Sequence, residues 1–546
     1  MENKIDRLLK ESCPWQDKSN KEWYVKDGDL RELIEAEKQG LFHPPKIKYV
    51  LEKKFFDELF KDSNKYGILI LRGPRRIGKS STLKYLVKEY IDKKEDPNRF
   101  VYLSLDKEDL FIGSKKRIFL RELIKNVINK YKKENKPLVL ILDEVTFYEG
   151  WCRAFKNLID EGIIGPGIGM IATGSYSLDL SSAKRELSGR FGPLGEAFGG
   201  DIFMYPRKFI ELSESLLGGD FKNFIGKNIG DFGKRCGMIE YLANYQTKEN
   251  NIKFGYEQLL NQILYQYHDD LHDLFKEIYL YSGGYPRSFY RAILSKRSGE
   301  VAVSDSRYIE DIYNLLVTDS KKFRLSEETL KSILKKIEFP SMEITYTSLI
   351  KLKKEDVEKY ISYLKASGLF AFIPLVSSST QIDVENLLVT PNREKLKLII
   401  TDPAAFIAIY MGSRGITGDI IKHTKEIFTQ KEKIKELLFE SIVVSHLLRS
   451  PIFRKSSLVE NVCFVKKENE ELVDSLAWYV NWKNELVLVA VEAKTGNIDL
   501  KEIKRKSNIL KDEFNIKRLI VVSNNKELKI EEDYVVIPIE IFLLFL

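Results

Sequence analysis

Short apolar runs alternate with amphipathic stretches from residue 65 onward. The stretches between the runs have helical periodicity, and this alternation predicts βαβ units. Residues 1–45 are charged and helical in pattern, so we expect a lead-in rather than a domain. Four runs have the unbroken apolar character of strands buried on both faces of a parallel sheet, namely residues 67–71, 99–105, 137–142 and 169–173.

The pattern changes several times after Glu211. A glycine-rich stretch, residues 218–237, predicts a loop or insertion, and helical periodicity returns over residues 256–293. Two or three short helices are expected within residues 326–373, and the polar segment 376–381 predicts a flexible connection. A last α/β region is predicted from a helix at 436–448 and two apolar runs, 476–480 and 486–491.

Length and composition indicate a globular protein of several domains. A chain of 546 residues is too long for one hydrophobic core, and 43% of its residues are hydrophobic against 31% charged. Four scattered cysteines without a CxxC pair and five histidines predict neither a disulfide framework nor a structural zinc site. No signal-peptide core is present at the start, and the apolar run 535–546 is interrupted by Glu540, so we expect a cytoplasmic protein without a membrane span.

A phosphate-binding loop follows the first predicted strand. The sequence from Gly73 to Ser80 fits G-x-x-x-x-G-K-[ST], between a buried strand and a helix that begins near Lys79. Backbone N–H groups would cradle the phosphates of ATP, Lys79 would neutralise them, and Ser80 would bind Mg²⁺. The residues expected to contact the nucleotide are Gly73, Pro74, Arg75, Arg76, Ile77, Gly78, Lys79, Ser80 and Ser81.

Two acids end the third predicted strand. Asp143 would hold Mg²⁺, and Glu144 would polarise the attacking water as the general base. This pair follows the glycine loop by about sixty residues, and the two motifs in this order predict hydrolysis of ATP rather than binding alone.

Four further positions are candidates for contact with the nucleotide. Ser175, after the next strand, either senses the γ-phosphate or caps the following helix. Arg185 and Arg190 either supply an arginine finger to a neighbouring subunit of a homo-oligomer or are ordinary surface residues. Arg287 is a weaker candidate for a second phosphate-sensing arginine.

These motifs together resemble a family of prokaryotic AAA+-like ATPases of the AAA_14 type that carry a C-terminal DUF4143 domain. The motifs that carry the resemblance are Gly73–Ser81, Asp143–Val145, Thr173–Ser175, Ser188–Gly192 and Gly283–Pro286. The resemblance implies an α/β fold with a P-loop NTPase parallel-sheet core, a helical lid, a winged helix and a C-terminal restriction-endonuclease-like α/β domain. The implied segments are a lead-in at 1–45, the ATPase core at 46–212, the lid at 213–322, the winged helix at 323–400 and the nuclease-like domain at 401–546.

The predicted winged helix would place residues 356–366 as its recognition helix. Its lysines could meet DNA phosphates, but acids in the same segment nearly balance them, so a structural or protein-contact role remains open. The net charge of +8, from 88 basic and 80 acidic residues, permits DNA binding without requiring it.

The last domain contains a D…E-x-K pattern similar to the PD-(D/E)xK nuclease signature. Asp474 and Glu492 would share a divalent metal, and Lys494 would point to the same face of its strand as Glu492. Glu440 lies where that fold often supplies another acid, and Lys501 or Lys504 could approach the phosphate. Three interpretations remain open: an active nuclease centre, an inactive nuclease-like binding module, and a hairpin whose charges are only solvated.

Two functions follow from these patterns. In the first, ATP hydrolysis drives a DNA-associated activity of the nuclease-like domain. In the second, ATP binding and hydrolysis switch the assembly of protein partners, and the nuclease-like domain is inactive.

Overall fold

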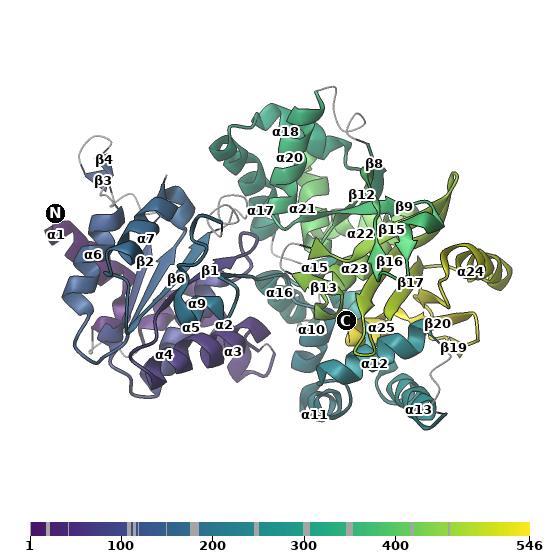
Figure 1. The fold of residues 1–546 in the computed structure, drawn as a ribbon, viewed down its shortest axis with the longest axis horizontal. Coiled ribbons are helices and arrows are strands. Elements are labelled where there is room, and N and C mark those ends of the chain that lie inside the picture. The colour runs from purple at the N-terminus through teal and green to yellow at the C-terminus, as the bar shows by residue number, and fades with distance from the viewer. Residues whose placement is uncertain are drawn as a thin grey trace. The chain divides into compact units, whose positions relative to one another are not determined.

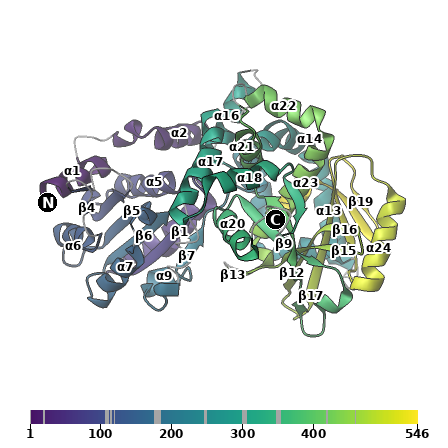
Figure 2. The same cartoon turned by 90° about the horizontal axis from the view of Figure 1, so that it is seen from above.

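The computed structural model describes residues 2–17, 22–41, 43–105, 111–112, 116–117, 120–148, 150–174, 185–244, 250–298, 306–345, 353–416, 420–456 and 459–546. The chain divides into two compact units, Met1–Tyr205 and Pro206–Leu546. Figures 1 and 2 show the ribbon from two directions. Among the described residues, no helix combines the length and apolar character needed to cross a membrane.

The first unit is built on a five-stranded parallel sheet. Its strands are β1 (Gly67–Arg72), β2 (Phe100–Ser104), β5 (Leu138–Asp143), β6 (Ile168–Gly174) and β7 (Asp201–Phe203). They lie in the order β2-β5-β6-β1-β7, and every neighbouring pair is parallel. All residues of β1, β5 and β6 are buried, which confirms the parallel sheet that the apolar runs predicted.

Helices lie on both sides of this sheet (Figures 1 and 2). The segment predicted as a lead-in contains two of them and belongs to the first unit, because Trp15 Nε1 donates to the carbonyl of Phe100 on β2 at 3.1 Å. The small strands β3 (Phe111–Ile112) and β4 (Lys116–Arg117) form a separate hairpin. The helices are α1 (Glu2–Ser12), α2 (Gly28–Lys38), α3 (Lys46–Leu51), α4 (Asp57–Lys61), α5 (Lys79–Asp92), α6 (Leu120–Tyr131), α7 (Trp151–Asp160) and α9 (Gly192–Glu196).

The second unit begins with a group of helices. The glycine-rich stretch predicted as a loop is helical, so that prediction is wrong. The helices before the first strand are α10 (Phe209–Leu216), α11 (Gly218–Asn228), α12 (Phe232–Ala243), α13 (Asn250–Gln266), α14 (His268–Asp273), α15 (Leu280–Ser282), α16 (Pro286–Arg297), α17 (Ser306–Asp319) and α18 (Glu327–Lys336). A π-helical segment, Leu274–Tyr279, joins α14 to α15.

A nine-stranded mixed sheet forms the centre of the second unit. Its order is β19-β20-β18-β17-β16-β15-β9-β12-β8. The strands are β8 (Ser341–Ile344), β9 (Phe370–Val376), β12 (Asn392–Ile400), β15 (Val462–Lys467), β16 (Glu470–Val480), β17 (Leu486–Lys494), β18 (Leu519–Ser523), β19 (Lys529–Ile530) and β20 (Tyr534–Pro538). Two short hairpins lie outside it, β10 (Ile382–Asp383) with β11 (Leu388–Val389) and β13 (Arg454–Ser456) with β14 (Val459–Glu460).

The sheet joins the two segments predicted as a winged helix and a nuclease-like domain. Strand β9 pairs in parallel with β15, with Phe464 opposite Leu375, so strands from either side of residue 400 share one ladder. Helix α20 (Lys354–Ala366) precedes β9, as the recognition-helix pattern predicted. The later helices are α21 (Pro403–Ser413), α22 (Ile420–Gln430), α23 (Glu432–Arg449), α24 (Leu500–Phe514) and α25 (Ile539–Phe542), and α23 packs against several strands. The division into two separate domains stays a prediction.

Candidate nucleotide site and carboxylate centre

The glycine loop connects β1 to α5, and its shape depends on two glycines. Gly73 has φ 153°, and a Cβ atom there would lie 2.4 Å from the carbonyl oxygen of Met204, which follows β7. Gly78 has φ 94° at the N-cap of α5, where residues other than glycine are strained. The loop therefore brings backbone N–H groups to a helix N-terminus with no side chain in the way, which fits the phosphates of a nucleotide.

Lys79 lies in the first turn of α5 and is buried. Its ammonium donates to two carbonyls of its own loop, that of Gly73 at 2.9 Å and that of Pro74 at 3.0 Å. Burial lowers the pKa of Lys79, and the nearby carboxylates of Glu144 and Asp143 oppose that shift. A buried ammonium whose hydrogen bonds go to backbone carbonyls is well placed to pair with an anionic ligand.

Asp143 lies at the end of β5 and accepts hydrogen bonds from three hydroxyl groups. The Ser80 hydroxyl donates to Oδ2 at 2.6 Å. Tyr102 on β2 also donates to Oδ2, and Thr173 on β6 donates to Oδ1. Burial and the Asp143 carboxylate raise the pKa of Tyr102 well above its usual value, so this hydroxyl stays a donor. Carboxylate and hydroxyl oxygens are the ligands that Mg²⁺ prefers, so Ser80 and Asp143 fit that ion.

Glu144 has an uncommon backbone conformation beside these oxygens. Its φ of 57° and ψ of 45° are left-handed, a region that costs a residue other than glycine about 1 kcal/mol or more. The Glu144 backbone N–H points to the Thr173 hydroxyl at 3.4 Å. The turn places Glu144 directly after Asp143, and its role as the general base stays a prediction.

Ser175 and Arg190 are the other two predicted catalytic residues of the first unit. Ser175 falls outside the described residues, and it is Thr173, two positions earlier, that contacts Asp143. Arg190 forms an ion pair with Asp160 at the end of α7, with 2.8 Å between Nε and Oδ1. Its role as an arginine finger stays a prediction.

The three predicted residues of the last domain lie on two neighbouring antiparallel strands. Ser475 of β16 pairs with Val491 of β17, which brings Asp474 opposite Glu492. The backbone N–H of Ala493 donates to Asp474 Oδ2 at 2.6 Å. Lys494 Nζ lies 2.9 Å from Glu492 Oε1. The D…E-x-K residues therefore meet at one end of the β16–β17 pair.

Asp474 and Glu492 repel each other inside the fold. Burial raises the pKa of Asp474 well above its usual value, and the Glu492 and Glu440 carboxylates raise it further. Oε2 of Glu492 is buried and accepts no hydrogen bond from the described residues. Its Oε1 atom also contacts a buried lysine, Lys506 of α24, at 2.8 Å.

Lys397, which the sequence analysis did not single out, places a cation among the acids of this centre. Its ammonium lies 2.5 Å from Glu440 Oε1 and 3.9 Å from Asp474 Oδ1, and it also pairs with Glu471. Burial lowers the pKa of Lys397, but these carboxylates more than offset that effect and raise it. An internal ammonium thus occupies the space between three carboxylates that are close enough to share a metal ion.

Comparisons with known proteins identify one region of the chain. The AAA domain family AAA_14 matches residues 65–213. No curated protein matches the chain. The matching solved structures include Cdc6p from Pyrobaculum aerophilum (14% identity, 70% of this chain and 95% of that chain, TM-score 0.24), PCH-2 from C. elegans (14%, 42% and 71%, 0.22) and a RuvB variant from Thermotoga maritima (14%, 61% and 90%, 0.26). Superpositions this weak carry no conclusion about the chain.

Proposed function

We propose that the first unit binds ATP with Mg²⁺ and hydrolyses it. The observation that supports this most directly is the hydrogen bond between Ser80 and Asp143, because it joins the two predicted magnesium-binding side chains from separate motifs. The match of residues 65–213 to an AAA domain agrees with this proposal.

Each group of the site has a distinct role in this proposal. The loop backbone from Gly73 to Gly78 holds the phosphates, and Lys79 leaves its carbonyl partners to pair with them. Mg²⁺, when bound, neutralises charge on the phosphate oxygens. Glu144 takes the proton from the attacking water, while Thr173 and Tyr102 orient Asp143.

The test is steady-state ATP turnover with matched variants. Lys79→Ala is expected to lose nucleotide binding and turnover. Glu144→Gln is expected to bind ATP but turn over at least ~100-fold more slowly, since general bases contribute that much. Lys88→Ala on the same helix and Glu134→Gln in an exposed turn are the controls and are expected to keep wild-type turnover. Normal turnover by both site variants would refute the proposal.

For the output of ATP hydrolysis, two proposals remain, and Lys397 favours one of them. A DNA-associated nuclease activity needs a divalent metal at Asp474 and Glu492. The ammonium groups of Lys397, Lys494 and Lys506 already pair with acids of that centre, which supports the alternative of an inactive nuclease-like domain and a nucleotide-dependent switch. The buried pairs then have a structural role.

A cleavage assay separates the two outputs. Single- and double-stranded DNA are incubated with the wild-type protein, ATP and either Mg²⁺ or Mn²⁺, beside Lys494→Ala. We expect no Lys494-dependent cleavage and no stimulation of ATP turnover by DNA. Cleavage that disappears in Lys494→Ala would instead support the nuclease.

If the arginine of a neighbouring subunit completes the ATP site, turnover per chain rises with protein concentration, and Arg190→Ala removes that rise.

A further inference from the structure

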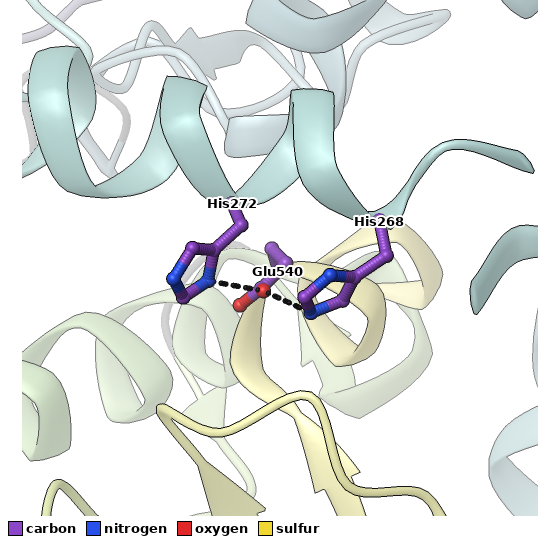
Figure 3. A group of neighbouring side chains, drawn as sticks. All are labelled: His268, His272 and Glu540. Atoms are coloured by element: carbon purple, nitrogen blue, oxygen red, sulfur yellow. Dashed lines mark hydrogen bonds and ion pairs between the residues drawn. The ribbon is translucent and has the colours of Figure 1, made fainter. Parts of the chain in front are cut away.

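Two histidines and a glutamate of the second unit meet in a cluster separate from the carboxylates around Lys397. His268 and His272 lie one turn apart on α14, and Glu540 is on α25, 268 residues after His272. Figure 3 shows both imidazoles turned toward the Glu540 carboxylate, which lies between them. His268 Nε2 is 3.0 Å and His272 Nδ1 is 2.8 Å from the same oxygen, Glu540 Oε1.

The burial of Glu540 requires a positive charge nearby. Its side chain is fully buried, and Oε2 accepts no hydrogen bond from the described residues. Among those residues, only the two histidines pair with this carboxylate. Nε2 of His268 is also buried, and its contact with Glu540 does not meet hydrogen-bond geometry, so this nitrogen has no hydrogen-bond partner among the described residues. Two buried atoms that can bind a metal, Oε2 of Glu540 and Nε2 of His268, thus lack hydrogen bonds from the described residues, and a bound cation would satisfy both.

A second carboxylate fixes the orientation of the first imidazole. Nδ1 of His268 lies 3.2 Å from Asp269 Oδ1, and Lys526 holds the same oxygen at 2.8 Å. An N–H on Nδ1 leaves the lone pair of Nε2 directed toward Glu540. Carboxylates that bind the outer nitrogen of a histidine in this way commonly support metal ligation.

We propose that His268 Nε2, His272 Nδ1 and Glu540 bind one divalent transition-metal ion, zinc by preference. Two histidines and one carboxylate form an established zinc ligand set, with a fourth position left for water. Ligand atoms about 2.1 Å from a tetrahedral ion lie about 3.4 Å apart, so the present contacts need to lengthen by only about half an ångström. All three ligand atoms already lie within 4.8 Å of one another.

The site would have a structural consequence independent of ATP. Helix α14 belongs to the helices before the sheet, and α25 follows its strand β20. A shared metal ion therefore connects the helical group to the end of the chain's last strand. The sequence pattern predicts no zinc site because one ligand lies 268 residues from the others and no cysteine takes part.

The experiment measures zinc binding by full-length protein without an affinity tag. After chelator treatment and removal of the chelator, ZnCl₂ is titrated by calorimetry, bound zinc is counted by elemental analysis, and thermal unfolding is recorded with and without zinc. We expect one zinc ion per chain and a higher melting temperature. Cobalt(II) in place of zinc should give the visible absorption bands of a four-coordinate site.

Three variants and one control make the assignment specific. His272→Ala removes a partly exposed ligand and is expected to weaken binding more than ~100-fold, because even outer partners contribute about 10–100-fold. Glu540→Gln keeps the shape of the buried side chain and should abolish binding, and Asp269→Ala should weaken it roughly 10-fold. His423→Ala, which changes a half-buried histidine of α22 that pairs with Glu426, should bind like the wild type.

The outcomes decide the proposal without ambiguity. No zinc bound by the wild type, or equal binding by the wild type and His272→Ala, overturns it. If Glu540→Gln fails to fold, His272→Ala still decides, because its circular dichroism without metal verifies its fold.

Discussion

The hydroxyl of Ser80 donates a 2.6 Å hydrogen bond to Oδ2 of Asp143, across 63 positions of sequence. This contact places the two predicted magnesium-binding side chains together. It leads to the first prediction, because removing one of two ligands should affect the metal-dependent step rather than nucleotide binding.

Ser80→Ala is expected to lower Mg²⁺-dependent ATP turnover by about 100-fold while keeping metal-free nucleotide binding within a few-fold of wild type. Turnover is measured against Mg²⁺ concentration, and binding is measured with a fluorescent nucleotide in chelator. Ser63→Ala, in the turn before β1, is the control. Equal loss of metal-free binding would contradict a metal-specific role.

Tyr102→Phe tests the support of Asp143 from the neighbouring strand. The variant removes one of the three hydroxyl donors to that carboxylate without changing the volume of the ring. Loss of such an outer partner usually weakens metal affinity about 10–100-fold, so the Mg²⁺ concentration for half-maximal turnover should rise by about 10-fold. Tyr131→Phe, whose hydroxyl donates to Gln16 instead, should leave it unchanged.

Gly73→Ala tests the close approach of the loop to the backbone after β7. The new Cβ would lie 2.4 Å from the Met204 carbonyl oxygen, so the loop must move. We expect at least a tenfold loss of nucleotide affinity, measured by fluorescence titration. Gly28→Ala meets nothing within 4 Å and serves as the control. Wild-type affinity in Gly73→Ala would show that the loop tolerates a side chain there.

The strands of the first unit could be predicted because burial on both faces demands unbroken apolar runs. Each of the four runs predicted in residues 67–173 overlaps a strand of the structure. The short strand β7 has no such run, and its place beside β1 depends on pairing that no local pattern encodes.

The helices of residues 218–243 could not be predicted from glycine content. Each glycine inside a helix costs about 1 kcal/mol, which favours a loop locally. Buried residues at helical spacing outweigh that cost: Phe221 and Ile225 on α11, and Met238 and Leu242 on α12. Tertiary packing therefore determines the helical structure of this segment, and the contacts involved can be identified only in the folded chain.

The sequence motifs locate the candidate residues of both centres, but they do not identify the side chains that contact those residues in the structure. The glycine loop and the acids of β5 are contiguous in sequence, whereas Tyr102 and Thr173 reach Asp143 because β2 and β6 flank β5. Lys397 lies on β12. In the sheet, β9 and β15 separate β12 from β16, the strand that carries Asp474. A lone lysine in an exposed-looking segment carries no local signal for such a contact.

Asp402 predicts a pH dependence of the second unit. It accepts the backbone N–H groups of Gly284 at 2.7 Å and Ala404 at 2.9 Å. Burial raises the pKa of Asp402 to about 6, although Arg449 opposes this. Because the folded pKa is above the unfolded value, this group's contribution is fully present below about pH 4 and is lost as pH rises through 6.

The contribution of Asp402 to the free energy of unfolding that is lost in this way is of the order of 3 kcal/mol. Hydrogen exchange of peptides that contain Gly284, corrected for intrinsic rates, should therefore show more opening at pH 7 than at pH 5. Asp402→Asn should flatten this dependence, whereas Asp220→Asn, on an exposed part of α11, should keep it. An unchanged pH dependence in Asp402→Asn would assign it to another group.

Lys397→Met gives the last prediction, because it removes the ammonium from three buried or half-buried carboxylates. Removing one partner of a buried ion pair leaves uncompensated charge and typically costs about 3–5 kcal/mol. The thermal transition of the second unit, followed by calorimetry, should therefore shift down by several degrees. Lys395→Met lies on the same strand with an exposed side chain, and it should leave the transition unchanged. A transition equal to wild type in Lys397→Met would mean that the acids do not need this cation, and a divalent metal would again become the better explanation for their grouping.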